Sequence, residues 1–146
     1  MKRFQLKTWT LMYGLIWLSF IQILFVLYSL LGNDVLTIAV HAPLGLVIFG
    51  FAFLVNHKVQ SSGCPDRIKR ITKVTRNLAL LQGLLGFVLA AGISMGWADL
   101  YLYIVSLLHV ANALAIITQA SSSATAYDMW EEKEYQVEMS APLPSP

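Results

Sequence analysis

Two histidines, His41 and His109, lie inside long apolar segments and stand out chemically in this sequence. His41 follows Val35 by six residues and His109 follows Leu100 by nine, and neither segment contains Asp, Glu, Lys or Arg. At about 1.5 Å of rise per helical residue, they lie about 9 and 13 Å from the same side of a membrane. An ionisable residue inside a membrane helix faces the bundle interior and is a functional candidate. Two imidazoles from different helices at one level predict a bis-histidine site for haem iron.

Small residues beside the two histidines predict room for a flat cofactor. Gly45 lies one turn beyond His41, and Ala113 lies one turn beyond His109, with Asn112 on a similar face. Such residues would let a porphyrin approach the helix backbone. The alternative is that small residues serve close packing of membrane helices, and that each histidine only bonds to a neighbouring helix.

Other chemistries are less well supported by the sequence. Copper or zinc would need a cluster of further His, Cys or carboxylate ligands, and no apolar segment contains one. His57 lies beside Lys58 at the end of an apolar segment, which is typical of an interfacial residue. A quinone site is a further alternative, with polar contacts from His41, Gln82 and Tyr101.

The elements that must position these residues are four apolar helices. The chain has 146 residues, of which 57% are hydrophobic and 12% charged. About 20 apolar residues cross a bilayer as a helix, and such segments occur at about 9–31, 35–55, 78–95 and 100–120. The first is too long for the apolar core of a signal peptide, and no small-residue cleavage site follows it. The predicted fold class is all-α, an integral membrane four-helix bundle.

The distribution of basic residues predicts the orientation. Nine of the ten lie before the first span or between the second and third, and the other two connections have none. They are Lys2, Arg3, Lys7, Lys58, Arg67, Lys69, Arg70, Lys73 and Arg76. Basic loops stay on the cytoplasmic side, so both termini are expected there, in a multi-pass protein of the plasma membrane. These charges indicate contact with lipid headgroups rather than with nucleic acid.

The polar segments complete the predicted organisation. Residues 56–77 are expected to form a loop, with an interfacial helix from Asp66 onward that leads into the third span. The domain boundaries are 1–127 for the four-helix domain and 128–146 for an acidic cytoplasmic tail, whose proline-rich end is expected to be disordered. Cys64, the single cysteine, cannot form an intramolecular disulfide and is interpreted as structural or incidental.

Residues 80–92, LLQGLLGFVLAAG, resemble a helix of the haem A synthase family with the pattern Q-x-x-L-G, here Gln82, Leu85 and Gly86. The following segment, HVANALAIITQA, is similar to the histidine-bearing helix of that family. That family is built from two four-helix halves, each with a histidine pair, and one archaeal branch has a single half. The resemblance implies that His41 and His109 hold the iron.

The resemblance also implies a wider cofactor-binding set and a role. That set is Gly45, Gln82, Gly86, Asn112 and Ala113. The catalytic half of the family has a glutamate one turn before the first histidine and commonly a cysteine pair in a long outer loop. This sequence has Thr37 at the first position and only Gly32 to Asp34 in that loop, which favours the half that holds haem b without catalysis.

Three functions follow as expectations. The leading hypothesis is a bis-histidine b-type haem protein of a respiratory membrane system, for electron transfer or haem handling. The second is a compact haem A synthase that oxidises haem O. The third is a haem-free structural subunit of a larger membrane respiratory complex. The expected partners are the lipid bilayer and other membrane subunits or further copies of the chain, with no nucleic acid.

Overall fold

Four long helices account for nearly all of the structure. The computed structural model describes residues 7–29 and 34–140, and its helices are α1 (Thr8–Ser29), α2 (Asp34–Gln60), α3 (Asp66–Ser94) and α4 (Asp99–Ser140). Each is long and apolar enough to cross a membrane. The predicted all-α class and the four helices are therefore confirmed.

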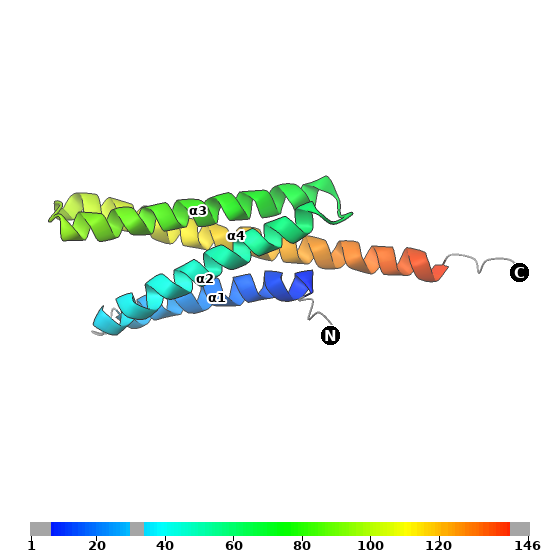
Figure 1. Cartoon of the computed structure of the whole chain (residues 1–146), viewed down its shortest axis with the longest axis horizontal. Helices are drawn as coiled ribbons and strands as arrows, with labels where there is room; N and C mark the ends of the chain where they lie inside the picture. Colours follow the sequence, from blue (N-terminus) through cyan, green and yellow to red (C-terminus); the bar gives the residue numbers. More distant parts are fainter. Residues whose placement is uncertain (1–6, 30–33, 141–146) are drawn as a thin grey trace, which may run out of the picture.

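The helices form a ring in which each contacts two neighbours. Contacts join α1 to α2, α2 to α3, α3 to α4 and α4 to α1, so α2 and α4 lie diagonally opposite each other. Two antiparallel hairpins, α1–α2 and α3–α4, lie side by side at one end of the bundle and diverge toward the other (Figure 1). The converging end carries the turn between α2 and α3 and is called the α2–α3 end. The diverging end carries the turn between α3 and α4 and is called the α3–α4 end.

The polar segment 56–77, expected as a loop, is mostly helical. Helix α2 continues to Gln60, and α3 begins at Asp66, so only residues 61–65 connect them. No separate interfacial helix exists, because α3 runs without interruption through Asp66–Ser94. Its 29 residues give a length of about 43 Å, which exceeds a hydrocarbon core of about 30 Å. The basic residues of this segment therefore lie on the last turn of α2 and the first turns of α3, and not in a loop.

Helix α4 continues well beyond the expected fourth span. It has 42 residues, so it is about 63 Å long and projects past the α2–α3 turn (Figure 1). No structural break occurs at the expected boundary between residues 127 and 128. Near that point the Tyr13 hydroxyl donates a hydrogen bond of 2.7 Å to the Asp128 carboxylate, which ties α4 to α1. The proline-rich segment 141–146 lies outside the described residues.

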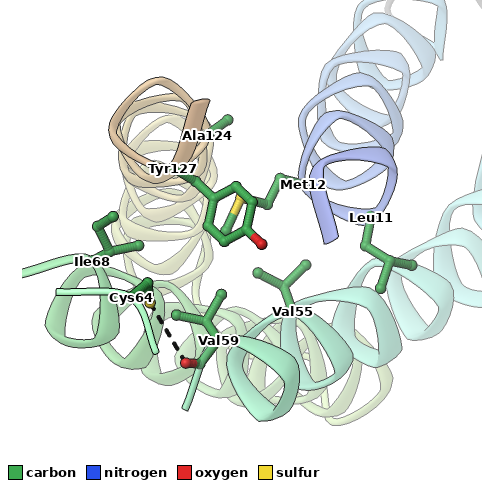
Figure 2. Close-up of a cluster of buried hydrophobic side chains, with 8 residues drawn as sticks. All are labelled: Leu11, Met12, Val55, Val59, Cys64, Ile68, Ala124 and Tyr127. Atoms are coloured by element: carbon green, nitrogen blue, oxygen red, sulfur yellow. Dashed lines mark hydrogen bonds between the residues drawn. The ribbon is translucent and has the colours of Figure 1, made fainter. Parts of the chain in front are cut away.

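All four helices contribute to an apolar cluster at the α2–α3 end. In Figure 2, Met12, Tyr127, Val55 and Val59 lie in the space between the helices. The members of this terminal cluster are Leu11, Met12, Val55, Val59, Cys64, Ile68, Ala124 and Tyr127. A second cluster follows it along the bundle and contains Leu15, Ile48, Ala52, Ala79 and Ala120. Together they hold the two hairpins against each other.

Cys64 belongs to this terminal cluster, although the sequence places it in a polar connection. It is only 2% exposed, and its thiol lies 3.6 Å from the backbone oxygen of Val59 (Figure 2). The turn at residues 61–65 therefore folds back onto the bundle. The structural interpretation of this residue agrees with its position.

Candidate functional site

The rings of His41 and His109 lie next to each other in the interior of the bundle. Their centroids are 6.1 Å apart, and the ring planes are inclined by 46°. His41 is on α2 and His109 on α4, the diagonal pair, so the two rings meet across the bundle axis. The sequence placed them at one depth, and the structure brings them together.

The distance between the rings matches a shared metal ion. A metal–nitrogen bond of about 2 Å, added to a ring radius of about 1.1 Å, gives about 6 Å between two imidazoles on opposite sides of one ion. The observed 6.1 Å is close to this value. Within residues 7–29 and 34–140, no group of three or more His, Cys, Asp or Glu could hold a metal. The structure therefore brings two imidazoles together without a further set of protein metal ligands in the described chain.

Gln22 of α1 contacts His41 in two places. Its amide nitrogen donates a hydrogen bond of 3.1 Å to the backbone oxygen of His41. The same nitrogen lies 3.4 Å from Nε2 of the His41 ring. Gln22 was not among the residues predicted to form the site. The available signal was a glutamine in the middle of an apolar span, where polar side chains are uncommon and functional.

Gly45 makes room for Gln22. A Cβ at Gly45 would lie 3.2 Å from the Gln22 amide nitrogen, so a larger residue would displace that amide from His41. The sequence predicted that Gly45 leaves room for a porphyrin. In the structure, the neighbouring side chain that uses this room is Gln22.

Gly86 plays a similar part for the second histidine. A Cβ at Gly86 of α3 would lie 3.4 Å from Cε1 of His109 and 4.0 Å from its Nδ1. The bare backbone of α3 therefore forms one wall against the His109 ring. This contact places Gly86 beside the His109 ring.

Asn112 and Gln82 pair with each other rather than with a histidine. The Asn112 amide donates hydrogen bonds of 2.7 Å to Oε1 of Gln82 and 2.9 Å to the backbone oxygen of Leu78. Asn112 is buried, so this pair joins α3 to α4 one turn below His109. Ala113, beside Asn112, is half-buried.

Among the described residues, four buried side-chain polar atoms have no hydrogen-bond partner. They are Ser19 Oγ, Gln22 Oε1, His41 Nδ1 and His109 Nδ1. Buried polar groups are normally satisfied, and each exception requires an explanation. Three of the four belong to His41, His109 and Gln22, which contacts His41, and Ser19 lies one turn before Gln22 on α1. Ser19, like Gln22, was missed because hydropathy treats a single serine as part of an apolar helix.

The remaining predicted polar residues lie apart from the histidine pair. His57 is exposed near the α2–α3 end, and Tyr101 is 64% exposed at the α3–α4 end. An open hollow of about 450 Å³ lies at the α2–α3 end. Its lining residues are Lys7, Trp9, Asp128, Glu131, Glu132 and Tyr135. It contains no histidine, so the unpartnered atoms, and not this hollow, define the candidate site.

No protein-family model matches the chain, and no curated protein or solved structure matches it significantly. The similarity to the haem A synthase family therefore stays a prediction from the short motifs around Gln82 and His109. The function has to be argued from the geometry of the site.

Proposed function

We propose that this chain is a membrane-bound b-type haem protein, in which His41 and His109 would hold the haem iron. The observation that carries the proposal is the pair of half-buried rings 6.1 Å apart across the bundle axis. Each ring has a buried Nδ1 without a hydrogen-bond partner. Neutral imidazole nitrogens are ligands for haem iron. The role proposed is electron transfer or haem handling in a respiratory membrane system.

The residues present fit this cofactor. The two histidines would hold the iron, and bound haem would supply reversible one-electron chemistry there. Gly86 leaves the His109 ring against bare backbone. Gln22 donates a hydrogen bond to the backbone oxygen of His41 and so joins α1 to α2 beside the pair. Because the connections at the α3–α4 end lack Lys and Arg, side chains such as Trp97 and Tyr101 would donate hydrogen bonds to the propionates.

The bilayer is the proposed environment, with the α2–α3 end in the cytoplasm. Large apolar side chains point outward from the helices, such as Leu46 at 73% exposure and Phe87 at 72%. Contact with lipid would remove this surface from water. The basic residues at the α2–α3 end satisfy the preference of Lys and Arg for the cytoplasmic side. We therefore place the chain as a multi-pass protein of the plasma membrane.

The single histidine pair favours a carrier over a haem A synthase. Oxidation of haem O requires a substrate haem that enters and leaves, in addition to a fixed electron-donating haem. The sequence has three histidines, and the third, His57, is exposed toward the other end of the bundle. One copy of the chain therefore offers one haem site. A haem-free structural subunit would leave the four unpartnered polar atoms without an explanation.

The direct test is the reduced-minus-oxidised absorption spectrum of the purified protein in detergent. The proposal expects a low-spin b-type spectrum and one haem per chain by pyridine haemochrome assay. A folded protein that contains no haem, and does not bind haem added to it, would contradict the proposal. Copurification with larger respiratory subunits in that case would support the structural alternative.

A further inference from the structure

Two contacts join α2 to α3 near the turn between them. The side-chain amide of Gln60 donates a hydrogen bond of 2.8 Å to the backbone oxygen of Lys69. Seven residues away on both helices, the guanidinium carbon of Arg76 lies 5.8 Å from the centroid of the Phe53 ring. Because the two helices advance by the same number of residues between these contacts, one face of α2 runs alongside one face of α3 over this length.

Positive side chains follow the boundary between these two faces. On α3, Lys73 lies between Lys69 and Arg76, at the spacing that puts all three on one side of a helix. On α2, His57 lies between the two residues that make the contacts. The basic strip is the set His57, Lys69, Lys73 and Arg76. Residues 35–98 contain a single carboxylate, Asp66, so α2 and α3 offer these charges little neutralisation.

Arg76 is restrained by groups that carry no charge. Its Nε and Nη2 donate hydrogen bonds of 3.2 and 2.8 Å to Oδ1 of Asn77, and the Phe53 ring lies beside its guanidinium. Two of the five N–H donors of the guanidinium are used in this way. A planar guanidinium matches the geometry of a phosphate group and can donate to it in pairs. The restrained Arg76 therefore keeps its positive charge and is suited to a phosphate.

The position of Arg76 along α3 matches the level of lipid headgroups in the proposed bilayer. It precedes Ser94, the end of the helix, by 18 residues, or about 27 Å, which is close to the hydrocarbon thickness of about 30 Å. The side chains that follow toward the membrane centre are apolar. The Phe49 and Phe53 rings lie 4.6 Å apart, and Leu80, one turn after Arg76, is 46% exposed. Charge followed by apolar surface is the order of a phospholipid headgroup and its acyl chain.

We propose that the basic strip binds the phosphate of one anionic phospholipid, with an acyl chain along Phe49, Phe53 and Leu80. Arg76 is the main donor to the phosphate, and Lys73 adds positive charge beside it. Basic residues near a membrane attract anionic lipids in general, but basic sites between helices hold individual headgroups. The proposal depends on the bilayer environment and does not depend on haem.

Native mass spectrometry of the protein in detergent tests the lipid class. The unmodified protein is expected to retain one phosphatidylglycerol at a concentration at which it retains no phosphatidylcholine. Inorganic phosphate at the concentration of the lipid should not displace it, because the apolar side chains contribute to binding. Equal retention of the two lipids, or displacement by phosphate, would overturn the proposal.

A pair of charge variants tests the position of the site. Arg76→Gln is expected to weaken phosphatidylglycerol binding about tenfold, through the loss of a charge-assisted hydrogen bond. Arg67→Gln is the matched control, because it removes the same charge from the same helix. Arg67 is exposed and lies two residues before Lys69, on the opposite side of α3, so its variant should bind as tightly as the unmodified protein. Equal losses would mean that only total charge matters, which would refute a defined site.

A third variant keeps every charge and guards against misfolding. Phe53→Leu removes the ring beside Arg76 and is expected to weaken binding about threefold. Circular dichroism would establish that each variant is folded. If Arg76→Gln does not fold, Phe53→Leu and Lys73→Gln decide, and unchanged affinity in both would overturn the proposal. Haem absorbance separates this result from the proposed function, since retention of phosphatidylglycerol by a chain without haem would contradict only the haem proposal.

Discussion

The two ends of the bundle are built from different kinds of contact. At the α2–α3 end, eight buried side chains from all four helices and the short turn form the terminal cluster (Figure 2). At the α3–α4 end the hairpins diverge (Figure 1), and the side chains between them include unpartnered polar groups such as those of His41 and His109. One end is closed by apolar packing, whereas the other contains polar side chains without a hydrogen-bond partner.

This difference shows how a small bundle can combine stability with a site. Between membrane helices there is little hydrophobic driving force, so close van der Waals packing has to hold them together. The terminal cluster supplies that packing and fixes the hairpins at one end. Among the described residues, neither buried apolar cluster lies at the other end. Iron coordination by both histidines would provide the missing link there.

The largest expected effect comes from removing either ligand. His41→Ala or His109→Ala should abolish the low-spin b-type spectrum completely, because one axial nitrogen is lost. His57→Ala should leave the spectrum unchanged, since His57 is exposed near the α2–α3 end. The measurement is the reduced-minus-oxidised spectrum at equal protein concentration. A low-spin haem that survives both substitutions would mean that the site lies elsewhere.

Weakening the packed end should affect stability and leave the spectrum intact. Met12 is 1% exposed within the terminal cluster, so Met12→Ala should create a cavity and reduce the free energy of unfolding by about 2 kcal/mol or more. Met95→Ala is the matched control, because Met95 is 72% exposed. Unfolding in detergent would be followed by circular dichroism. Equal stability of the two variants would show that the terminal cluster does not hold the bundle.

An intermediate effect is expected where α3 touches the site. Gly86→Leu should push the His109 ring aside, because a Cβ alone would already be in van der Waals contact with it at 3.4 Å and a leucine side chain extends further, so haem affinity should fall. Gly83→Leu on the same helix is the control, because nothing lies within 4 Å of its Cβ position. Haem titration of the two apoproteins would compare the affinities. A greater loss in Gly83→Leu would remove Gly86 from the site.

Much of this architecture could be predicted from hydropathy, but helix ends could not. Apolar composition identifies the part of a helix that would contact lipid, not the residue at which the helix stops. Polar segments such as 56–60 and 66–77 continue α2 and α3, because backbone hydrogen bonding and helix propensity do not require an apolar face. Helix α4 likewise passes through the expected boundary near residue 127 without a break.

The sequence was sufficient to predict a pair of histidines, but not to predict which residues contact them. Equal depth in two spans indicated that His41 and His109 could meet, since helix rise is constant. The partners depend on how the helices are rotated and which neighbours they choose, and one sequence does not fix this. Gln22 therefore became visible only when α1 was placed beside α2. Asn112 was expected to face the cofactor but instead bonds to Gln82.

The smallest expected effect concerns the reactivity of Cys64. It tests separately whether this side chain is buried and on which side of the membrane the α2–α3 end lies. Because Cys64 is 2% exposed in the terminal cluster, a maleimide should react with it slowly in the folded protein from either side. Gly63→Cys in a Cys64→Ala chain would place a thiol in the same turn but exposed, with nothing within 4 Å of the Cβ position. That thiol should react quickly in inverted vesicles and not in intact cells if the α2–α3 end is cytoplasmic. Fast labelling in intact cells would reverse the proposed orientation. Equally fast labelling of native Cys64 would show instead that residues 61–65 separate from the terminal cluster in the folded protein. The α2–α3 end would then not be tightly packed, contrary to the difference described between the two ends.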